Sequence, residues 1–138
     1  MYLLDTNIIS EIAKNPAGLA ARRFASEPRE MLCTSVIVSA EVLFGLRNGA
    51  VAIQTSKAML AVLDYLQVIA LEPKVAEAYA EVRSAMKRIG LSITPNDFFI
   101  AAHAMTIGAT LVTADQAFRF VPELKVENWL RDAPAGEG

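Results

Sequence analysis

The chain has 138 residues, the length of one ordinary domain with room for its own hydrophobic core. Its formal net charge of −2 argues against binding to nucleic acid through an overall basic surface. Hydrophobic residues make up 54%, but no apolar run reaches the roughly 20 residues that a membrane span needs, and no signal peptide is recognisable. We therefore expect a cytoplasmic protein with no membrane association, whose apolar surface is partly covered by a partner or a second copy.

Predicted strands alternate with predicted helices along the chain. The opening apolar run stops at Asp5, Thr6 and Asn7, so a buried strand leads directly into a helix. From patterns of this kind we expect, in chain order, strands at 2–4, 31–33, 67–71, 109–112 and 124–126 and helices at 7–14, 17–25, 36–48, 51–65, 73–89 and 94–107.

The last two of these helices differ in character. The helix over 73–89 is amphipathic, with apolar residues at alternating spacings of four and three and charged residues on its other faces. The helix that follows Pro95 is apolar almost all round, and such a helix is usually buried in the middle of a domain. His103 lies on it about 120° around the axis from Asp97, so we expect His103 in the core or an interface.

The alternation indicates an α/β fold, in which a central parallel β-sheet is flanked by helices on both faces as an α/β/α sandwich. We assign residues 1–131 to this single domain and expect the tail, 132–138, to be disordered. Cys33, the only cysteine, falls in a strand-like run and is expected in the core of a protein from a reducing compartment.

Four carboxylates occupy positions that are unusual for a solvated charge. Asp5 ends the first strand, where open parallel sheets bind ligands, and Asp115 lies two residues past the strand that ends at Thr113. Glu41 has almost only apolar neighbours, and Asp97 lies in the first turn of the apolar helix. Each alone has a structural explanation, as a helix-dipole charge for Asp97, a turn residue for Asp115 and a helix-surface carboxylate for Glu41.

The predicted topology can bring Asp5 and Asp115 to the carboxyl edge of one sheet. Several carboxylates cannot stay ionised side by side without a cation, because like charges raise each other's pKa. An oxygen-only ligand set points to a hard ion, Mg²⁺ or Mn²⁺, rather than to zinc. We expect Asp5 and Asp97 to bind the principal ion with Glu41 close to it, and Asp115 to hold a second ion or orient the attacking water.

The segments that carry these carboxylates resemble those of the PIN-domain ribonucleases, in particular the VapC-type toxins of bacterial toxin–antitoxin pairs. The resemblance covers essentially the whole chain and is carried by LDTN at 4–7, SAEVLFG at 39–45, PNDFFIAA at 95–102, LVTADQAF at 111–118 and VENW at 126–129. It implies Mg²⁺- or Mn²⁺-dependent endoribonuclease activity on structured RNA, often tRNA. It also implies inhibition by a cognate antitoxin, and a homodimeric core.

The motif match also assigns residues to roles. The family's four acidic positions are taken by Asp5, Glu41, Asp97 and Asp115. Thr113 takes a Ser/Thr position that supports the site, and Asn7 matches a polar position close to it, so both are expected to hold carboxylates in place. The resemblance further implies products with 5′-phosphate and 3′-hydroxyl ends.

Contacts with RNA follow less directly from the sequence. Discounting the four site carboxylates changes the net charge from −2 to +2, which suits an RNA backbone. The basic residues selected as RNA contacts are Arg22, Arg23 and Arg47. Trp129, Phe118 and Phe120 can stack on bases, but core packing is the preferred interpretation of all three.

Two other functions stay open. A PIN-type fold retained as a binding or regulatory module would act with its antitoxin on nucleic acid and cut little or nothing, although the four filled acidic positions argue against it. An aspartyl-phosphate protein of the receiver or phosphatase type also ends its first strand in acidic residues. It requires a second carboxylate beside Asp5, where this chain has Thr6 and Asn7.

Overall fold

The computed structural model describes residues 1–131 and has the expected α/β architecture. A parallel sheet of five strands has the order β3-β2-β1-β4-β5. The strands are β1 (Tyr2–Leu4), β2 (Leu32–Ser35), β3 (Gln67–Ile69), β4 (Thr110–Val112) and β5 (Val126–Glu127). The helices are α1 (Thr6–Lys14), α2 (Leu19–Ser26), α3 (Val36–Asn48), α4 (Ile53–Tyr65), α5 (Val75–Arg88) and α6 (Pro95–Thr106), with short 3-10 turns η1 (Arg29–Met31) and η2 (Gln116–Phe120).

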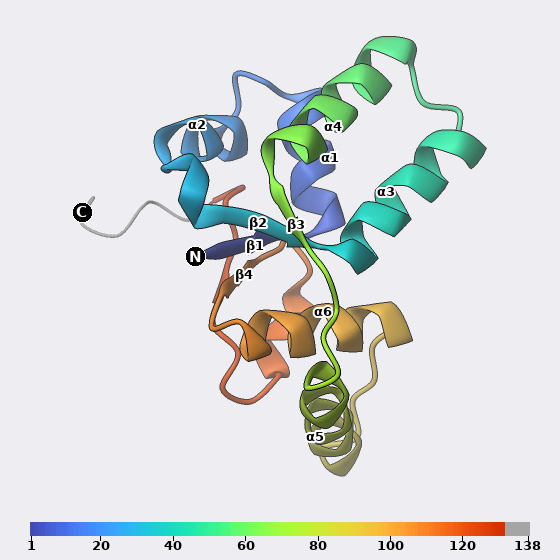
Figure 1. Ribbon diagram of the computed structural model, residues 1–138, viewed down its shortest axis with the longest axis vertical. Coiled ribbons are helices and arrows are strands. Elements are labelled where there is room, and N and C mark those ends of the chain that lie inside the picture. Colours follow the sequence, from blue (N-terminus) through green and yellow to red (C-terminus); the bar gives the residue numbers. More distant parts are fainter. Residues whose placement is uncertain (132–138) are drawn as a thin grey trace.

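Helices cover both faces of this sheet. Figure 1 shows α1 to α4 on one side of the strands and α5 and α6 on the other. The central strand β1 pairs with β2 on one side and β4 on the other, and Leu3 and Leu4 are fully buried. The predicted sandwich is therefore confirmed. Asp5 follows the carboxyl end of its middle strand, β1.

The element boundaries differ from the predicted ones by a few residues. The second strand runs on to Ser35, whose side chain accepts a hydrogen bond from the Ile37 N–H and so caps α3 directly. The last strand is Val126–Glu127, later than the predicted 124–126. Such shifts arise because strand ends depend on pairing with neighbours, which a local pattern does not contain.

Most of the predicted core residues are buried as expected. Cys33, Phe118 and Trp129 are buried, and so is His103, whose Nδ1 lies 2.8 Å from Ser35 Oγ. The core assignment was wrong for Phe120, which is 45% exposed.

Two findings concern the chain as a whole. Among residues 1–131 no helix is both long and apolar enough to cross a membrane. The tail 132–138, for which we predicted disorder, lies outside the described residues.

Candidate metal centre

Asp5 is held at the point where β1 becomes α1. Its backbone N–H donates to the Val112 carbonyl of β4 (2.9 Å), and its Oδ1 accepts the Thr6 N–H (2.8 Å), which makes Asp5 the N-cap of the helix. The Thr113 hydroxyl donates to Oδ2 at 2.8 Å. With 4% of its surface exposed, Asp5 is a buried carboxylate in a polar cage.

Burial and two neighbouring acids shift the pKa of Asp5. Burial raises the pKa of Asp5 from 3.8 to about 6, against the lowering effect of the hydrogen bonds from Thr113 and Thr6. The negative charges of Asp97 and Glu41 raise the Asp5 pKa further. These carboxylates, far apart in the sequence, are therefore close enough in space to act on each other.

Glu41 reaches the site from the second turn of α3. Its Oε1 accepts the Thr6 hydroxyl at 3.0 Å, and its Oε2 accepts from Asn96 Nδ2 at 3.5 Å. Thr6 therefore contacts Asp5 through its backbone and Glu41 through its side chain. Neither contact was predicted from the sequence, because hydrogen bonds between distant segments leave no local pattern.

Asp97 enters from the start of α6. Its N–H donates to the Thr94 hydroxyl (3.2 Å), the N-cap of that helix, and its side chain is half-buried. Burial raises the Asp97 pKa, and the charges of Glu41 and Asp115 raise it further, whereas hydrogen bonds with Thr94 lower it. The structure thus brings all four predicted acidic residues into one electrostatic group.

Thr113 and Asn7 link the fourth acid to the first. Thr113, 1% exposed, accepts the Asp115 N–H at its hydroxyl (3.1 Å) while donating to Asp5. Asn7 Nδ2 lies 3.4 Å from both Asp5 Oδ2 and Thr113 Oγ1, and its Oδ1 accepts the Ala114 N–H at 3.0 Å. The positioning role expected for both residues therefore has matching contacts. Asp115 itself is exposed and caps η2.

The donor set fits a hard dication. Every candidate ligand is a carboxylate oxygen, although within the described residues no three or more His, Cys, Asp or Glu side chains already form a metal-holding group. Mg²⁺ in proteins commonly has one or two carboxylates, keeps several waters and takes further oxygens from substrate phosphates. Asp5 and Asp97, with Glu41 reaching through water, suit that mode of binding.

Residues 2–124 match the PIN domain. The chain belongs to the PIN-domain family. The aspartyl-phosphate alternative is thereby set aside.

The similar proteins place this PIN domain among the VapC type. It is 33% identical over 131 residues to "Ribonuclease VapC2" of Rickettsia felis, and this match covers 94% of this chain and 98% of that relative. It is 26% identical over 129 residues to the "tRNA(fMet)-specific endonuclease VapC" of Salmonella typhimurium, over 93% and 97% of the two chains. A solved structure of VapBC2 from Rickettsia felis, bound to a DNA fragment from its promoter, has a TM-score of 0.81 and 29% identity, over 93% and 98%.

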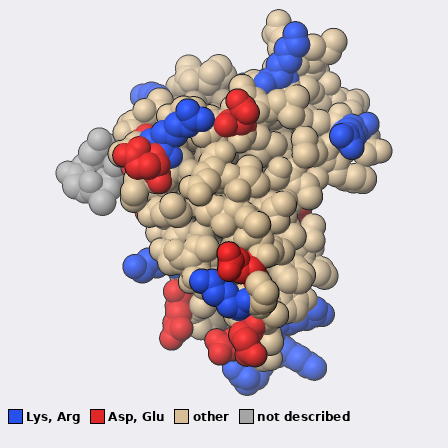
Figure 2. Space-filling view, in the orientation of Figure 1, with Lys and Arg blue, Asp and Glu red and all other residues tan. Residues whose placement is uncertain are grey.

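The three arginines predicted to contact RNA differ in their exposure to solvent. Arg22 and Arg47 are exposed and stay predictions. Arg23 was a wrong choice, because it is 6% exposed and forms ion pairs with Glu27 (2.8 Å) and Glu127 (3.2 Å). On the face shown in Figure 2, basic and acidic side chains are interspersed and no basic stripe crosses it.

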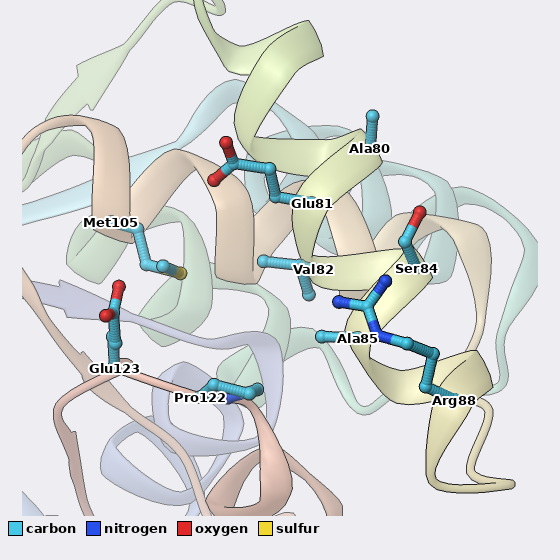
Figure 3. Close-up of a pocket in the computed structure, with 9 residues that line it drawn as sticks. All are labelled: Ala80, Glu81, Val82, Ser84, Ala85, Arg88, Met105, Pro122 and Glu123. Carbon is cyan, nitrogen blue, oxygen red and sulfur yellow. The ribbon is translucent and has the colours of Figure 1, made fainter.

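Two hollows adjoin the carboxylates, one lined by Glu41 and the other by Asp115. The hollow on the Glu41 side, about 150 Å³, lies between α1, α3 and α4 and includes Thr6 and Lys14. The hollow on the Asp115 side, about 120 Å³, also contains Thr113 and two arginines. A larger hollow of about 510 Å³ lies elsewhere, between α5, the end of α6 and the loop after η2, and contains none of the four acids (Figure 3).

Proposed function

We propose that this PIN domain is a Mg²⁺- or Mn²⁺-dependent endoribonuclease, the toxin of a VapBC-type toxin–antitoxin pair. The observation that carries the proposal is that hydrogen bonds through Thr6 and Thr113 join Asp5 to Glu41 and Asp115, while the charge of Asp97 raises the pKa of Asp5. The names of its relatives, ribonuclease VapC and a tRNA(fMet)-specific endonuclease, support RNA, including tRNA, as the substrate.

In this proposal each acidic residue of the site has its own role in RNA cleavage. Asp5 and Asp97 would hold the ion, Glu41 would contact it directly or through water, and Asp115 would orient the attacking water. A bound divalent ion offsets the phosphodiester charge and lowers the pKa of water that it coordinates. Thr113 keeps Asp5 oriented through a short hydrogen bond at 2.8 Å.

The partner in this proposal is an antitoxin that blocks the acidic site. Solved relatives are VapBC complexes, which supports a cognate antitoxin for this chain. An antitoxin arginine or lysine entering the site would replace the charge of the metal and inhibit the enzyme. We also infer a homodimer, because large apolar side chains are exposed outside α3 and α4 as well, among them Leu19 (52%) and Val68 (43%).

Two observations favour a second candidate function, that of a regulatory module. VapBC2 of Rickettsia felis was solved on promoter DNA, and the described residues of this chain hold no ready-made group of three metal ligands. Under this alternative the chain is a regulatory module that acts with its antitoxin on nucleic acid and cuts little.

Cleavage assays separate the two functions. Purified protein is mixed with total tRNA in Mg²⁺, in Mn²⁺ or in EDTA, and the RNA ends are mapped. We expect cleavage only with metal and a loss of more than about 100-fold in Asp5→Asn and in Asp97→Asn, since even outer partners of a metal site contribute 10–100-fold. The matched control is Asp64→Asn, an exposed acid on α4, which should cut normally. Tight RNA binding without cutting in either metal would favour the regulatory module.

A further inference from the structure

We propose that Arg119 and Arg131 form a phosphate-binding subsite for the RNA strand, next to the reacting phosphodiester. The inference rests on the proposed ribonuclease function and names part of its substrate contact. Its starting point is the hollow of about 120 Å³ on the Asp115 side of the carboxylates. Both arginines line this hollow together with Thr113 and Asp115.

Hydrogen bonds connect the lining of this hollow to the carboxylate of Asp5. The Asp115 N–H donates to Thr113 Oγ1 at 3.1 Å, and Thr113 Oγ1 donates to Asp5 Oδ2 at 2.8 Å. A group bound beside Asp115 is thus only two hydrogen bonds from the most buried carboxylate. An RNA chain whose scissile phosphate lies over Asp5 can place a neighbouring phosphate there.

Local contacts order the Arg119 side chain and the Arg131 backbone. Arg119 Nη1 donates to Gln116 Oε1 at 3.2 Å, and its guanidinium lies over the exposed Phe120 ring, 4.8 Å from the ring centre. Among the described residues, Arg119 has no ion pair with an acid. Arg131 follows a turn in which Asn128 accepts two backbone N–H groups, from Leu130 at its side chain (3.0 Å) and from Arg131 at its carbonyl (3.2 Å).

The chemistry of the lining favours a phosphate. Two arginines and one carboxylate, Asp115, line the hollow, and a bound metal would offset the charge of that carboxylate. Guanidinium groups match phosphate oxygens bidentately, which lysine cannot do. The hollow on the other side of the site has Glu41 and Lys14 among mainly apolar neighbours and offers no such match.

The test measures binding rather than cleavage. The affinity of the Asp5→Asn protein for a fluorescent 12-nucleotide single-stranded RNA is measured in EDTA by anisotropy, from 50 to 200 mM KCl. Arg119→Gln and Arg131→Gln are then added singly and together. We expect each to weaken binding about 3- to 10-fold and to reduce the log–log salt slope by about 0.7, the value for one lost phosphate contact on a single strand.

The matched control is Arg29→Gln. Arg29 is also exposed and stacked on an aromatic ring, Tyr65 at 4.5 Å, but it lies near β3, at the opposite edge of the sheet from β5. Equal affinity and equal salt slope in the Arg119 and Arg131 variants, with RNA still bound by the parent, would overturn the subsite and leave the ribonuclease proposal standing. If the parent itself has no affinity for this RNA, the subsite is overturned, and the tRNA cleavage assay with metal decides the ribonuclease proposal separately.

Discussion

Thr6 contacts two of the four acidic residues through different atoms. Its backbone N–H donates to Asp5, and its hydroxyl donates to Glu41. Because the backbone contact survives any side-chain change except proline, a substitution here isolates the orientation of Glu41. Few positions in the site allow one carboxylate to be disturbed while the other keeps its hydrogen bonds.

We predict that Thr6→Val lowers RNA cleavage and Mn²⁺ affinity about 10-fold, since Glu41 then keeps only the long contact from Asn96. Thr6→Ser keeps the hydroxyl and should recover most of both. Mn²⁺ binding is measured by calorimetry without RNA, so that a change in the metal site is seen independently of turnover. Wild-type Mn²⁺ affinity in Thr6→Val would show that Glu41 needs no help from this hydroxyl.

The pKa of Asp5 has a consequence for stability. Burial raises this pKa from 3.8 to about 6, so the folded protein binds the Asp5 proton more tightly than the unfolded chain does. The ionised carboxylate therefore lowers the free energy of unfolding above pH 6, by about 3 kcal/mol for two pKa units. This penalty disappears as the pH falls from about 6 towards 3.8.

We predict that Asp5→Asn in EDTA is more stable than the wild type at pH 7.5, by up to ~3 kcal/mol, and that the difference shrinks towards zero near pH 4. Urea unfolding at the two pH values measures it. A stability difference that does not change with pH would mean that Asp5 pays no burial penalty. Asp64→Asn, an exposed acid, is the control and should show little difference at either pH.

At the scale of elements, Arg23 of α2 ties the two ends of the described chain together. Its guanidinium bonds Tyr2 of β1 and Glu127 of β5 and lies 5.0 Å from the centre of the Trp129 ring. Glu127 also accepts from Trp129 Nε1 at 3.1 Å. One nitrogen of the guanidinium, Nη1, is buried without a hydrogen-bond partner, which reduces the net gain from the cluster.

We predict that Arg23→Ala lowers the free energy of unfolding by about 2 kcal/mol, measured by urea titration. The value is below the 3–5 kcal/mol of a fully buried pair, because Glu27 and Glu127 are 19% and 32% exposed and water can solvate them. Arg22→Ala, at the exposed neighbouring position, should change stability by less than about 0.5 kcal/mol. Equal stability of the two variants would mean that the cluster is energetically neutral.

At the scale of the whole molecule, the apolar surface is unevenly distributed. Leu43 and Phe44 on α3 and Ile53 and Leu60 on α4 are all more than a third exposed, although their helices also bury residues against the core. Apolar side chains gathered on two adjoining helices indicate a surface that another protein covers.

We predict that Phe44→Glu weakens binding of the cognate antitoxin at least 10-fold and leaves the unfolding free energy of the isolated chain within about 0.5 kcal/mol, since Phe44 is 68% exposed. Calorimetric titration with the antitoxin measures the first, and urea unfolding the second. Ile89→Glu, at a 56% exposed site just after α5, serves as the control. Undiminished antitoxin affinity would place the antitoxin on another surface.

The sequence by itself determined the fold class and the parallel sheet and singled out the four acidic residues, because these depend on local patterns. Hydrophobic period, helix caps and the strand-to-helix step at Asp5 are all contained in short segments. The apolar sequence of α6 likewise indicated a central buried helix, as observed for Ile100 and Ala101.

Only the tertiary structure decided which polar groups pair with which. Arg22 and Arg23 are adjacent and identical in the sequence, yet one is exposed and the other is buried, because the rotation of α2 directs only Arg23 towards Tyr2 and Glu127. The contact between Thr6 and Glu41 spans 35 residues, and that between Thr113 and Asp5 spans 108. Hydrogen bonds over such separations depend on how helices and strands dock, and no local pattern of residues encodes them.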